Sequence, residues 1–230
     1  MSDPAEFDQF ADNYDECLND ALAASGERKE FFARERVQWL AECLKEGGRL
    51  STNALDYGCG TGDTTLLLRQ ILGSESVVGL DVSTLSLQQA RARHGGRVQF
   101  FTFDGYAPDG SVDVVYCNGV FHHIPVAERA AAVDYVFRCL RPGGIFALWE
   151  NNPWNPGTQY VMYKCEFDHA AVKISPPEAA RLLRKGGFEV LRKDFRFFFP
   201  RALKVMRPAE SLLVKVPLGG QYQVLARKPM

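Results

Sequence analysis

With 230 residues, the chain is long enough to bury the core of one α/β domain, and no Pro/Ser-rich linker divides it. Its formal net charge of −1 favours neither nucleic acid nor a membrane surface as a partner. No apolar run is long enough to cross a membrane, and residues 1–6 lack the apolar core of a signal peptide, so we expect a cytoplasmic protein. The six cysteines are scattered without Cys-x-x-Cys spacing, which predicts free thiols and neither disulfides nor zinc ligands.

Two helices are expected before the first strand. Apolar residues recur at near-helical spacing over residues 7–18, and a second helix should cover residues 28–45. The first helix could simply cap the core, or it could form a lid over a ligand. We favour the lid for Tyr14, whose ring could touch that ligand.

From residue 54 onward, short apolar runs alternate with helical patterns. The runs that predict strands are residues 54–57, 77–81, 98–103, 112–117, 145–150, 188–191 and 221–226. Strands that are apolar on both faces and separated by helices predict a parallel, doubly wound sheet covered on both sides. Ligands of such sheets bind beyond the carboxyl ends of the strands. This rule selects Gly58, Asp81, Asp104, Asn118 and Glu150.

A loop with glycine at alternate positions, Gly58, Gly60 and Gly62, follows the first strand and precedes a helix. Such a loop lets backbone N–H groups approach a ligand closely at a helix N-terminus. The dinucleotide fingerprint would need glycine where Asp63 stands, which argues against a nicotinamide dehydrogenase.

Three aspartates fall in register with this loop. Asp81 ends the next strand, where a carboxylate can accept both hydroxyls of a ribose. Asp104 ends the third strand, where a carboxylate could accept the exocyclic amine of adenine, and Asp56 precedes the loop. Each could be a solvated strand-end cap, but together they favour a ligand with a ribose and an adenine and without a pyrophosphate.

These motifs and their order resemble those of class I S-adenosylmethionine-dependent methyltransferases, in the broad type 11 group that includes ubiquinone- and menaquinone-biosynthesis-type enzymes. The resemblance covers about residues 7–150, and the matching segments are 55–65, 79–83, 103–105, 112–125 and 140–144. It implies a Rossmann-like doubly wound sheet of seven strands, mostly parallel with an antiparallel last strand. It also implies S-adenosyl-L-methionine as the cofactor, and it specifies no acceptor.

The resemblance further implies where the cofactor lies. The methionine moiety is expected near Gly58 and Gly60, the ribose on Asp81, the adenine near Asp104, and the sulfonium near Asn118 and Tyr14. The expected cofactor-binding residues are Tyr14, Asp56, Gly58, Cys59, Gly60, Thr61, Gly62, Asp81, Val82, Asp104, Gly105, Asn118 and Gly119.

Two adjacent histidines, His122 and His123, follow the fourth strand, beside the methyl group in this arrangement. Histidine can remove a proton from a hydroxyl near neutral pH, so both are candidate catalytic bases, and we favour His123. Paired histidines can equally pack or hold the loop. Many methyltransferases need no strong base, because the sulfonium is already activated and positioning supplies most of the acceleration. Glu150 and His169 are lesser candidates.

The second half of the chain is harder to interpret. Trp154, Tyr160 and Tyr163 could wall a substrate pocket or could cover the sheet edge. Residues 151–154 superficially resemble the Asn-Pro-Pro-aromatic motif of amino-group methylases, but that motif belongs after the fourth strand and this one follows the fifth. The basic, Phe-rich residues 192–207 predict an alternating strand and a solvated helix face, in preference to a patch for an anionic acceptor or for nucleic acid.

We therefore expect a single domain with an N-terminal helical lid (1–48), a cofactor-binding core (49–150), and a substrate-side insert with the closing strands (151–230). The expected activity is methyl transfer to a small-molecule acceptor, by O-methylation because histidines are the plausible bases. The alternatives are C- or N-methylation, a lipid- or glycan-linked acceptor, or an S-adenosylmethionine-binding protein without transferase activity. We expect no metal, no nucleic acid partner and no stable membrane insertion, and the sequence leaves the oligomeric state open.

Overall fold

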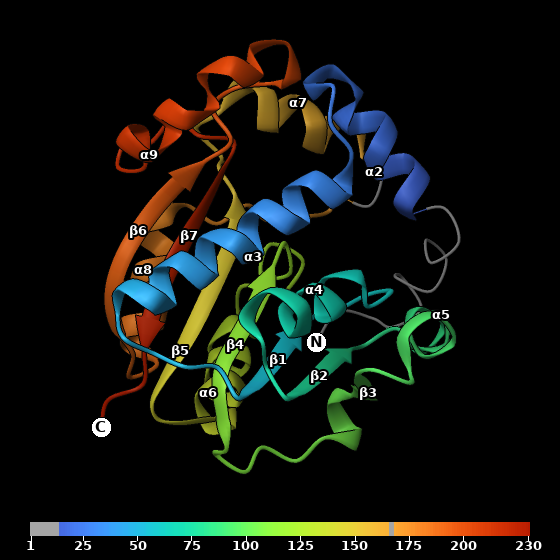
Figure 1. Cartoon of the computed structure of the whole chain (residues 1–230), viewed down its shortest axis with the longest axis vertical. Coiled ribbons are helices and arrows are strands. Elements are labelled where there is room, and N and C mark those ends of the chain that lie inside the picture. The colour runs from blue at the N-terminus through green and yellow to red at the C-terminus, as the bar shows by residue number, and fades with distance from the viewer. Residues whose placement is uncertain (1–13, 166–167) are drawn as a thin grey trace.

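One seven-stranded sheet organises the chain in the computed structural model, which describes residues 14–165 and 168–230 (Figure 1). Its strand order is β3-β2-β1-β4-β5-β7-β6. The strands are β1 (Asn53–Tyr57), β2 (Ser76–Asp81), β3 (Gln99–Thr102), β4 (Val112–Asn118), β5 (Leu140–Asn151), β6 (Glu189–Arg196) and β7 (Gln221–Arg227). The pairs from β3 to β5 are parallel, and β7 runs antiparallel to both β5 and β6. The predicted fold class is confirmed.

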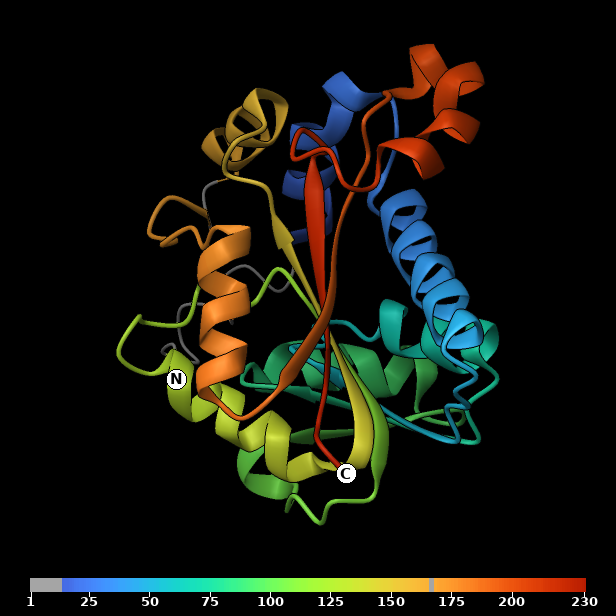
Figure 2. The same cartoon turned by 90° about the vertical axis from the view of Figure 1, so that its left-hand side faces the viewer.

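Helices cover both faces of this sheet (Figure 2). On one face, α3 (Lys29–Glu46), α4 (Asp63–Leu72) and α5 (Thr84–His94) contribute to one hydrophobic core. On the other, α6 (Arg129–Cys139) and α8 (Pro176–Lys185) contribute to a second core. The central strands β1, β4 and β5 meet apolar side chains on both sides, and their buried parts are therefore largely apolar.

Strand β4 shows this arrangement residue by residue. Val114 and Tyr116 belong to the core under α3, whereas Val115 and Cys117 belong to the core under α6 and α8. Alternate side chains of a strand point to opposite faces, so all four are buried although they enter different cores.

Side chains cap the first turns of two helices. The Ser83 hydroxyl accepts the backbone N–H of Ser86 at 3.0 Å at the start of α5. At the start of α8, the Glu178 carboxylate accepts the backbone N–H of Ser175 at 2.8 Å in a capping box.

Some element boundaries differ from expectation. The third strand stops at Thr102, because residues 103–105 form a short 3-10 helix, η2 (Phe103–Gly105). The fifth strand begins early, because Leu140 already pairs with Val112 of β4. Helix α6 begins late, because the Glu128 N–H bonds to the Pro125 carbonyl at 2.8 Å and closes a turn.

The remaining elements gather around the end of the sheet where the parallel strands finish (Figure 1). They are α2 (Tyr14–Leu22), η1 (Ala23–Ser25), α7 (Pro156–Lys164), η4 (Arg201–Ala209) and α9 (Glu210–Leu213). The first part of the helix expected over residues 7–18 lies outside the described residues, and α2 begins at Tyr14. The basic stretch 192–207 divides between β6 and the largely exposed η4, the arrangement favoured from the sequence.

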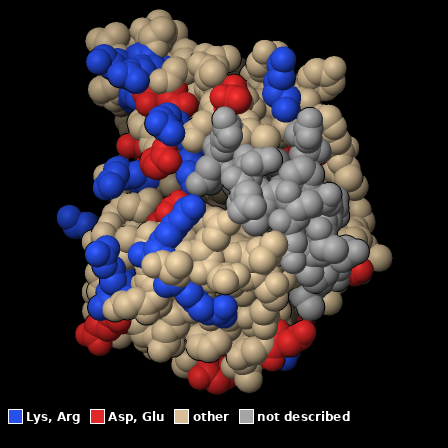
Figure 3. All heavy atoms as spheres, turned by 90° about the vertical axis from the view of Figure 1, so that its right-hand side faces the viewer, with Lys and Arg blue, Asp and Glu red and all other residues tan. Residues whose placement is uncertain are grey.

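No helix in the described part of the chain is long and apolar enough to cross a membrane. On the coloured part of the face in Figure 3, Lys and Arg side chains are interspersed with Asp and Glu, in keeping with the net charge of −1.

Candidate functional site

A cavity of about 440 Å³ lies beyond the carboxyl ends of β1, β2 and β4, where ligands of doubly wound sheets bind. Its walls come from the loop after β1, the end of β2, the turn after β4, and residues of α2 and α3. Its volume is in the range of cofactor sites. Ten of the residues predicted for cofactor or catalysis line it: Asp56, Gly58, Cys59, Gly60, Thr61, Asp81, Val82, Asn118, Gly119 and His123.

The glycine loop needs its glycines for two different reasons. Gly58 and Gly60 both have left-handed backbone angles, with φ of +77° and +51°. A Cβ on Gly58 would come within 2.3 Å of a methyl group of Val120, whereas one on Gly60 would meet no atom of the described residues within 4 Å. Glycine is therefore required at position 58 by packing against Val120. At position 60 the missing side chain lets a ligand in the cavity approach the backbone.

Asp81 fastens this loop to the end of β2. Its Oδ2 accepts the N–H of Gly60 at 2.7 Å, and its Oδ1 accepts the N–H of Ser83 at 2.9 Å. A carboxylate is a strong acceptor with about four lone-pair sites, and Asp81 is the group expected to bind the hydroxyls of a ribose.

Asp56 is buried at the base of the cavity and accepts the hydroxyl of Thr65 at 2.8 Å. The pKa of Asp56 is raised to about 7, mainly by burial; the Thr65 hydrogen bond opposes this rise and the Asp81 charge adds to it. A cationic ligand in the cavity would favour the ionised form of this carboxyl.

Two polar groups in the cavity wall lack the partners expected of buried groups. Asn118 Oδ1 is buried and has no hydrogen-bond partner among the described residues. Arg36 of α3 is also buried, and it donates to two neutral groups, the Tyr116 hydroxyl at 3.0 Å and Gln221 Oε1 at 2.8 Å. Within the described part of the chain no carboxylate lies at ion-pair distance from Arg36.

Buried polar atoms are normally paired, and buried cations are normally neutralised. A ligand with both an ammonium and a carboxylate, such as the methionine moiety of S-adenosylmethionine, would give Asn118 Oδ1 a hydrogen-bond donor and Arg36 an anionic partner. The residues of the cavity therefore fit that cofactor. Arg36 was missed from the sequence, because one arginine on a helix face carries no motif.

Asp63, which stands where a dinucleotide site would need glycine, ties three helices together. Its carboxylate pairs with Lys29 of α3 at 2.9 Å and with His94 of α5 at 3.0 Å. Burial would raise the pKa of Asp63, but the hydrogen bond and charge of Lys29, with those of His94, hold it below its usual value.

His122 is buried and does not line the cavity. Its Nδ1 lies 2.5 Å from Glu150 Oε2, and its Nε2 lies 3.3 Å from Asp168 Oδ1. Burial alone would lower the pKa of His122, but the Glu150 charge and the hydrogen bonds to both carboxylates raise it to about 10. An imidazolium between two carboxylates has no lone pair to accept a proton. This arrangement does not favour His122 as a base, and its catalytic role stays a prediction.

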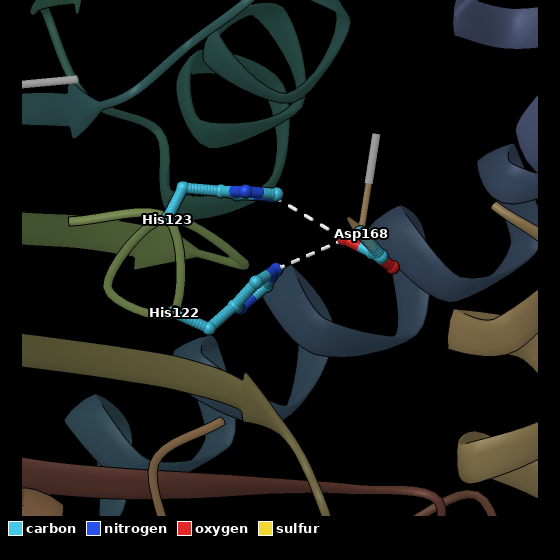
Figure 4. Close-up of side chains that lie close together, drawn as sticks. All are labelled: His122, His123 and Asp168. Carbon is cyan, nitrogen blue, oxygen red and sulfur yellow. Dashed lines mark hydrogen bonds and ion pairs between the residues drawn. The ribbon is translucent and has the colours of Figure 1, made fainter. Parts of the chain in front are cut away.

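His123 does line the cavity, and its Nε2 lies 3.3 Å from the same oxygen of Asp168 (Figure 4). Burial would raise the pKa of Asp168, but its hydrogen bonds from His122 and His123 lower it to about 2. Asp168 was missed from the sequence, because it lies far along the chain from the histidines and in no recognisable motif.

Several predicted residues lie elsewhere. Gly62 does not line the cavity, and Asp104 and Gly105 are exposed in η2, although their neighbour Phe103 does line it. The aromatic residues expected at the substrate are exposed and outside the cavity lining: Trp154, Tyr160 and Tyr163. Tyr14 begins α2, and its side chain lies outside the described residues. The roles of these residues stay predictions.

The chain is similar to known methyltransferases. A family described as a methyltransferase domain matches residues 54–144. The trans-aconitate 2-methyltransferase of Methylobacterium radiotolerans is 35% identical over 123 residues, a match that spans 51% of this chain and only 45% of that protein. An uncharacterised methyltransferase of Synechocystis sp. is 31% identical over 148 residues, which cover 60% of this chain and 68% of that protein.

The fold has close counterparts among solved structures. One is described as a methyltransferase dependent on S-adenosylmethionine, a possible histamine N-methyltransferase from Thermotoga maritima. It superposes with a TM-score of 0.65 over 97% of this chain and 98% of that one, at 19% identity. At this identity the likeness shows the fold alone.

Proposed function

This chain belongs to the class I S-adenosylmethionine-dependent methyltransferases, and on that premise we propose that it methylates an oxygen atom of a small-molecule acid. One observation carries the proposal: the cavity joins the glycine loop and Asp81 to the unpartnered Asn118 Oδ1 and to Arg36, whose hydrogen bonds go to neutral groups. Several relatives named trans-aconitate 2-methyltransferase support an acid as the acceptor.

When bound, S-adenosylmethionine supplies an electrophilic methyl group. The chain would hold this cofactor through groups already in the wall: Asp81 for the ribose, Arg36 for the carboxylate, and Asn118 with Asp56 for the ammonium. Because the methyl group is activated in the cofactor itself, the main task left to the protein is to orient the nucleophile and exclude water.

An acid acceptor suits the cationic groups of α3. Lys29 and Arg34 line the same cavity, and Arg34 is exposed at its rim. A carboxylate is ionised at neutral pH and is already a nucleophile, so its methylation needs no base. If the acceptor is a hydroxyl, His123 is the group placed to accept its proton.

We also propose that the N-terminal segment 1–48 closes over the ligands, with 49–150 as the cofactor-binding core and 151–230 on the substrate side. The lid is supported by Leu18 of α2 and by the residues of α3 that line the cavity. Figure 1 places α2 beyond the ends of the parallel strands, on the open side of the site.

A titration and an acceptor screen test the function. Calorimetry should detect binding of S-adenosylhomocysteine and none of NAD, and the reverse result would overturn the proposal. Release of S-adenosylhomocysteine should then be measured with di- and tricarboxylic acids, with phenols and alcohols, with amines, and with lipid- or glycan-linked acceptors. Turnover with amines alone would replace O-methylation by N-methylation. Binding without turnover on any class would favour a cofactor-binding protein without transferase activity.

A further inference from the structure

His122, His123 and Asp168, here called the His–His–Asp cluster, converge beside the cofactor cavity (Figure 4). We propose that this cluster binds one divalent transition-metal ion of the zinc type, with an open coordination position towards the cavity. The proposal concerns ion binding by the chain itself and does not depend on the proposed function.

The spacing of the atoms is the first support. The Nε2 atoms of His122 and His123 each lie 3.3 Å from Asp168 Oδ1, and all three atoms lie within 4.8 Å of one another. N–H···O hydrogen bonds usually measure about 2.7–3.2 Å, so both contacts are long for hydrogen bonds. Ligand atoms about 2.0–2.1 Å from a tetrahedral zinc are about 3.3–3.4 Å apart, which agrees with the two distances to Asp168 Oδ1.

The orientation of His122 is the second support. Glu150 Oε2 lies 2.5 Å from its Nδ1, and Glu150 Oε1 accepts the backbone N–H of Phe121 at 2.8 Å. The ring is therefore fixed by its Nδ1 side, and its Nε2 side faces Asp168. Metal-binding histidines almost always donate their second ring N–H to a carboxylate or carbonyl in this way.

Charge is the third support. Glu150 and Asp168 are both buried carboxylates, and a buried charge is costly unless it is neutralised. A divalent ion at the cluster would bring positive charge close to both carboxylates and so reduce the cost of burying them.

Access and ligand type define the site. His123 lines the cavity, and 14% of its side chain is exposed, so an ion held there can reach an acceptor. Three protein ligands and one position for water or substrate are typical of catalytic zinc. Two imidazoles and one carboxylate suit Zn²⁺, Fe²⁺ or Co²⁺ better than Mg²⁺ or Ca²⁺. This site could not be predicted from the sequence, because Asp168 lies far along the chain from the two adjacent histidines and shares no spacing motif with them.

The test uses the full chain, treated with a chelator, loaded with Zn²⁺, passed through a desalting column and analysed for bound metal. We expect one equivalent of zinc per chain. We also expect at least about tenfold weaker binding in Asp168→Asn and in His123→Gln, each of which weakens or removes a ligand. Co²⁺ should bind in place of zinc and give a visible absorption band that both variants lose.

His169→Ala is the matched control. His169 follows Asp168 directly, is exposed, and its Nε2 is 3.0 Å from the Tyr163 carbonyl outside the cluster. This variant should keep the full equivalent of zinc. The proposal is overturned if the unaltered chain retains no zinc, if Asp168→Asn and His123→Gln retain as much as the unaltered chain, or if His169→Ala loses it.

The variants chosen avoid the buried His122, whose loss could unfold the chain. Circular dichroism of each variant separates loss of metal from loss of fold. Binding of S-adenosylhomocysteine is measured on the same samples. A chain that binds S-adenosylhomocysteine without zinc would overturn only the metal site, and one that binds zinc without S-adenosylhomocysteine would overturn only the proposed function.

Discussion

The Asp81 carboxylate accepts the backbone N–H of Gly60 at 2.7 Å, which joins the end of β2 to the glycine loop after β1. This contact gives Asp81 two effects on ligand binding. It shapes the loop that faces the cavity, and its carboxylate is the expected acceptor for the hydroxyls of a ribose.

Asp81→Ala should therefore weaken binding of S-adenosylhomocysteine by about 1–3 kcal/mol, through loss of charge-assisted hydrogen bonds. Asp81→Asn should lose less affinity, because its amide oxygen can still accept the backbone N–H of Gly60. Calorimetric dissociation constants should therefore rank the unaltered chain as the tightest binder, Asp81→Asn next and Asp81→Ala last. Asp109→Ala is the control, because Asp109 bonds only to Ser111 in an exposed turn. Equal affinities for Asp81→Ala and the unaltered chain would remove Asp81 from the ribose.

Arg36→Met should weaken binding of ligands that carry the methionine carboxylate and spare binding of those that lack it. Loss of the guanidinium should weaken binding of S-adenosylhomocysteine, which has the carboxylate, by about 10- to 100-fold, the cost of one or two charged hydrogen bonds. Methylthioadenosine lacks that carboxylate, so its affinity should change by less than about threefold. Equal losses for both ligands would show that Arg36 acts by holding Tyr116 and Gln221 in place instead of binding the ligand.

The cofactor residues at the strand ends could be predicted from the sequence. Each follows its strand directly in the chain, so the position of the strand also fixes the position of the residue. Asp81 and Asn118 end up in one cavity because parallel strands finish at one edge, whatever the details of packing. Arg36 and Asp168 could not be found this way. Arg36 lies in the site because α3 packs against the sheet, where Arg36 bonds to Tyr116 of β4 and Gln221 of β7. Asp168 lies in the site because the tertiary fold brings it to the histidines, 46 residues from His122 in the chain.

The aromatic residues expected at the substrate are a different case, and their role stays a prediction. Trp154, Tyr160 and Tyr163 follow the core in sequence, and their aromatic character suggested a pocket wall. Helix α7 instead leaves Tyr160 and Tyr163 exposed, with 51% and 76% of each residue accessible. Residue type alone does not say which face of a short helix meets the ligand, because that depends on how the helix docks.

Asp56 should make stability depend on pH. Its pKa is raised to about 7 in the folded chain, mainly by burial, against an ordinary value of 3.8. Between these values the folded state holds a proton that the unfolded state has lost, so stability falls as pH rises, by as much as about 1.4 kcal/mol per pH unit. Asp56→Asn removes this dependence. Denaturant unfolding of both proteins from pH 4 to pH 8 should show the unaltered chain losing stability relative to the variant up to about pH 7, with no further change above it. A constant difference would contradict the raised pKa.

His123→Gln should leave binding of S-adenosylhomocysteine within about twofold, because glutamine keeps a polar group at the cavity wall. Its effect on turnover depends on the acceptor. With a hydroxyl acceptor, loss of a general base should slow transfer by about 100-fold or more, and the loss should shrink at high pH as the acceptor ionises. With a carboxylate acceptor no base is needed, so any loss of turnover in His123→Gln should be the same at every pH. Unaltered turnover with a hydroxyl acceptor would show that His123 is not the base.

Gly58 and Gly60 offer a matched pair of alanine substitutions. Both have positive φ, so alanine should cost about 1–2 kcal/mol of stability at either position. Only Gly58→Ala adds a clash, with Val120, which should cost about 1–3 kcal/mol more.

The two variants should also differ in what rescues them. Val120→Ala should restore part of the stability that Gly58→Ala loses, because it removes the clashing methyl group. It should restore none of the stability that Gly60→Ala loses, because the new methyl group there meets no atom of the described residues within 4 Å. Gly60→Ala should instead lose affinity for S-adenosylhomocysteine, because its methyl group extends beside the cavity. Thermal unfolding and calorimetry measure the two quantities. Equal stability losses without rescue would contradict the packing role of Gly58, and full affinity in Gly60→Ala would show that the ligand does not approach the backbone at Gly60.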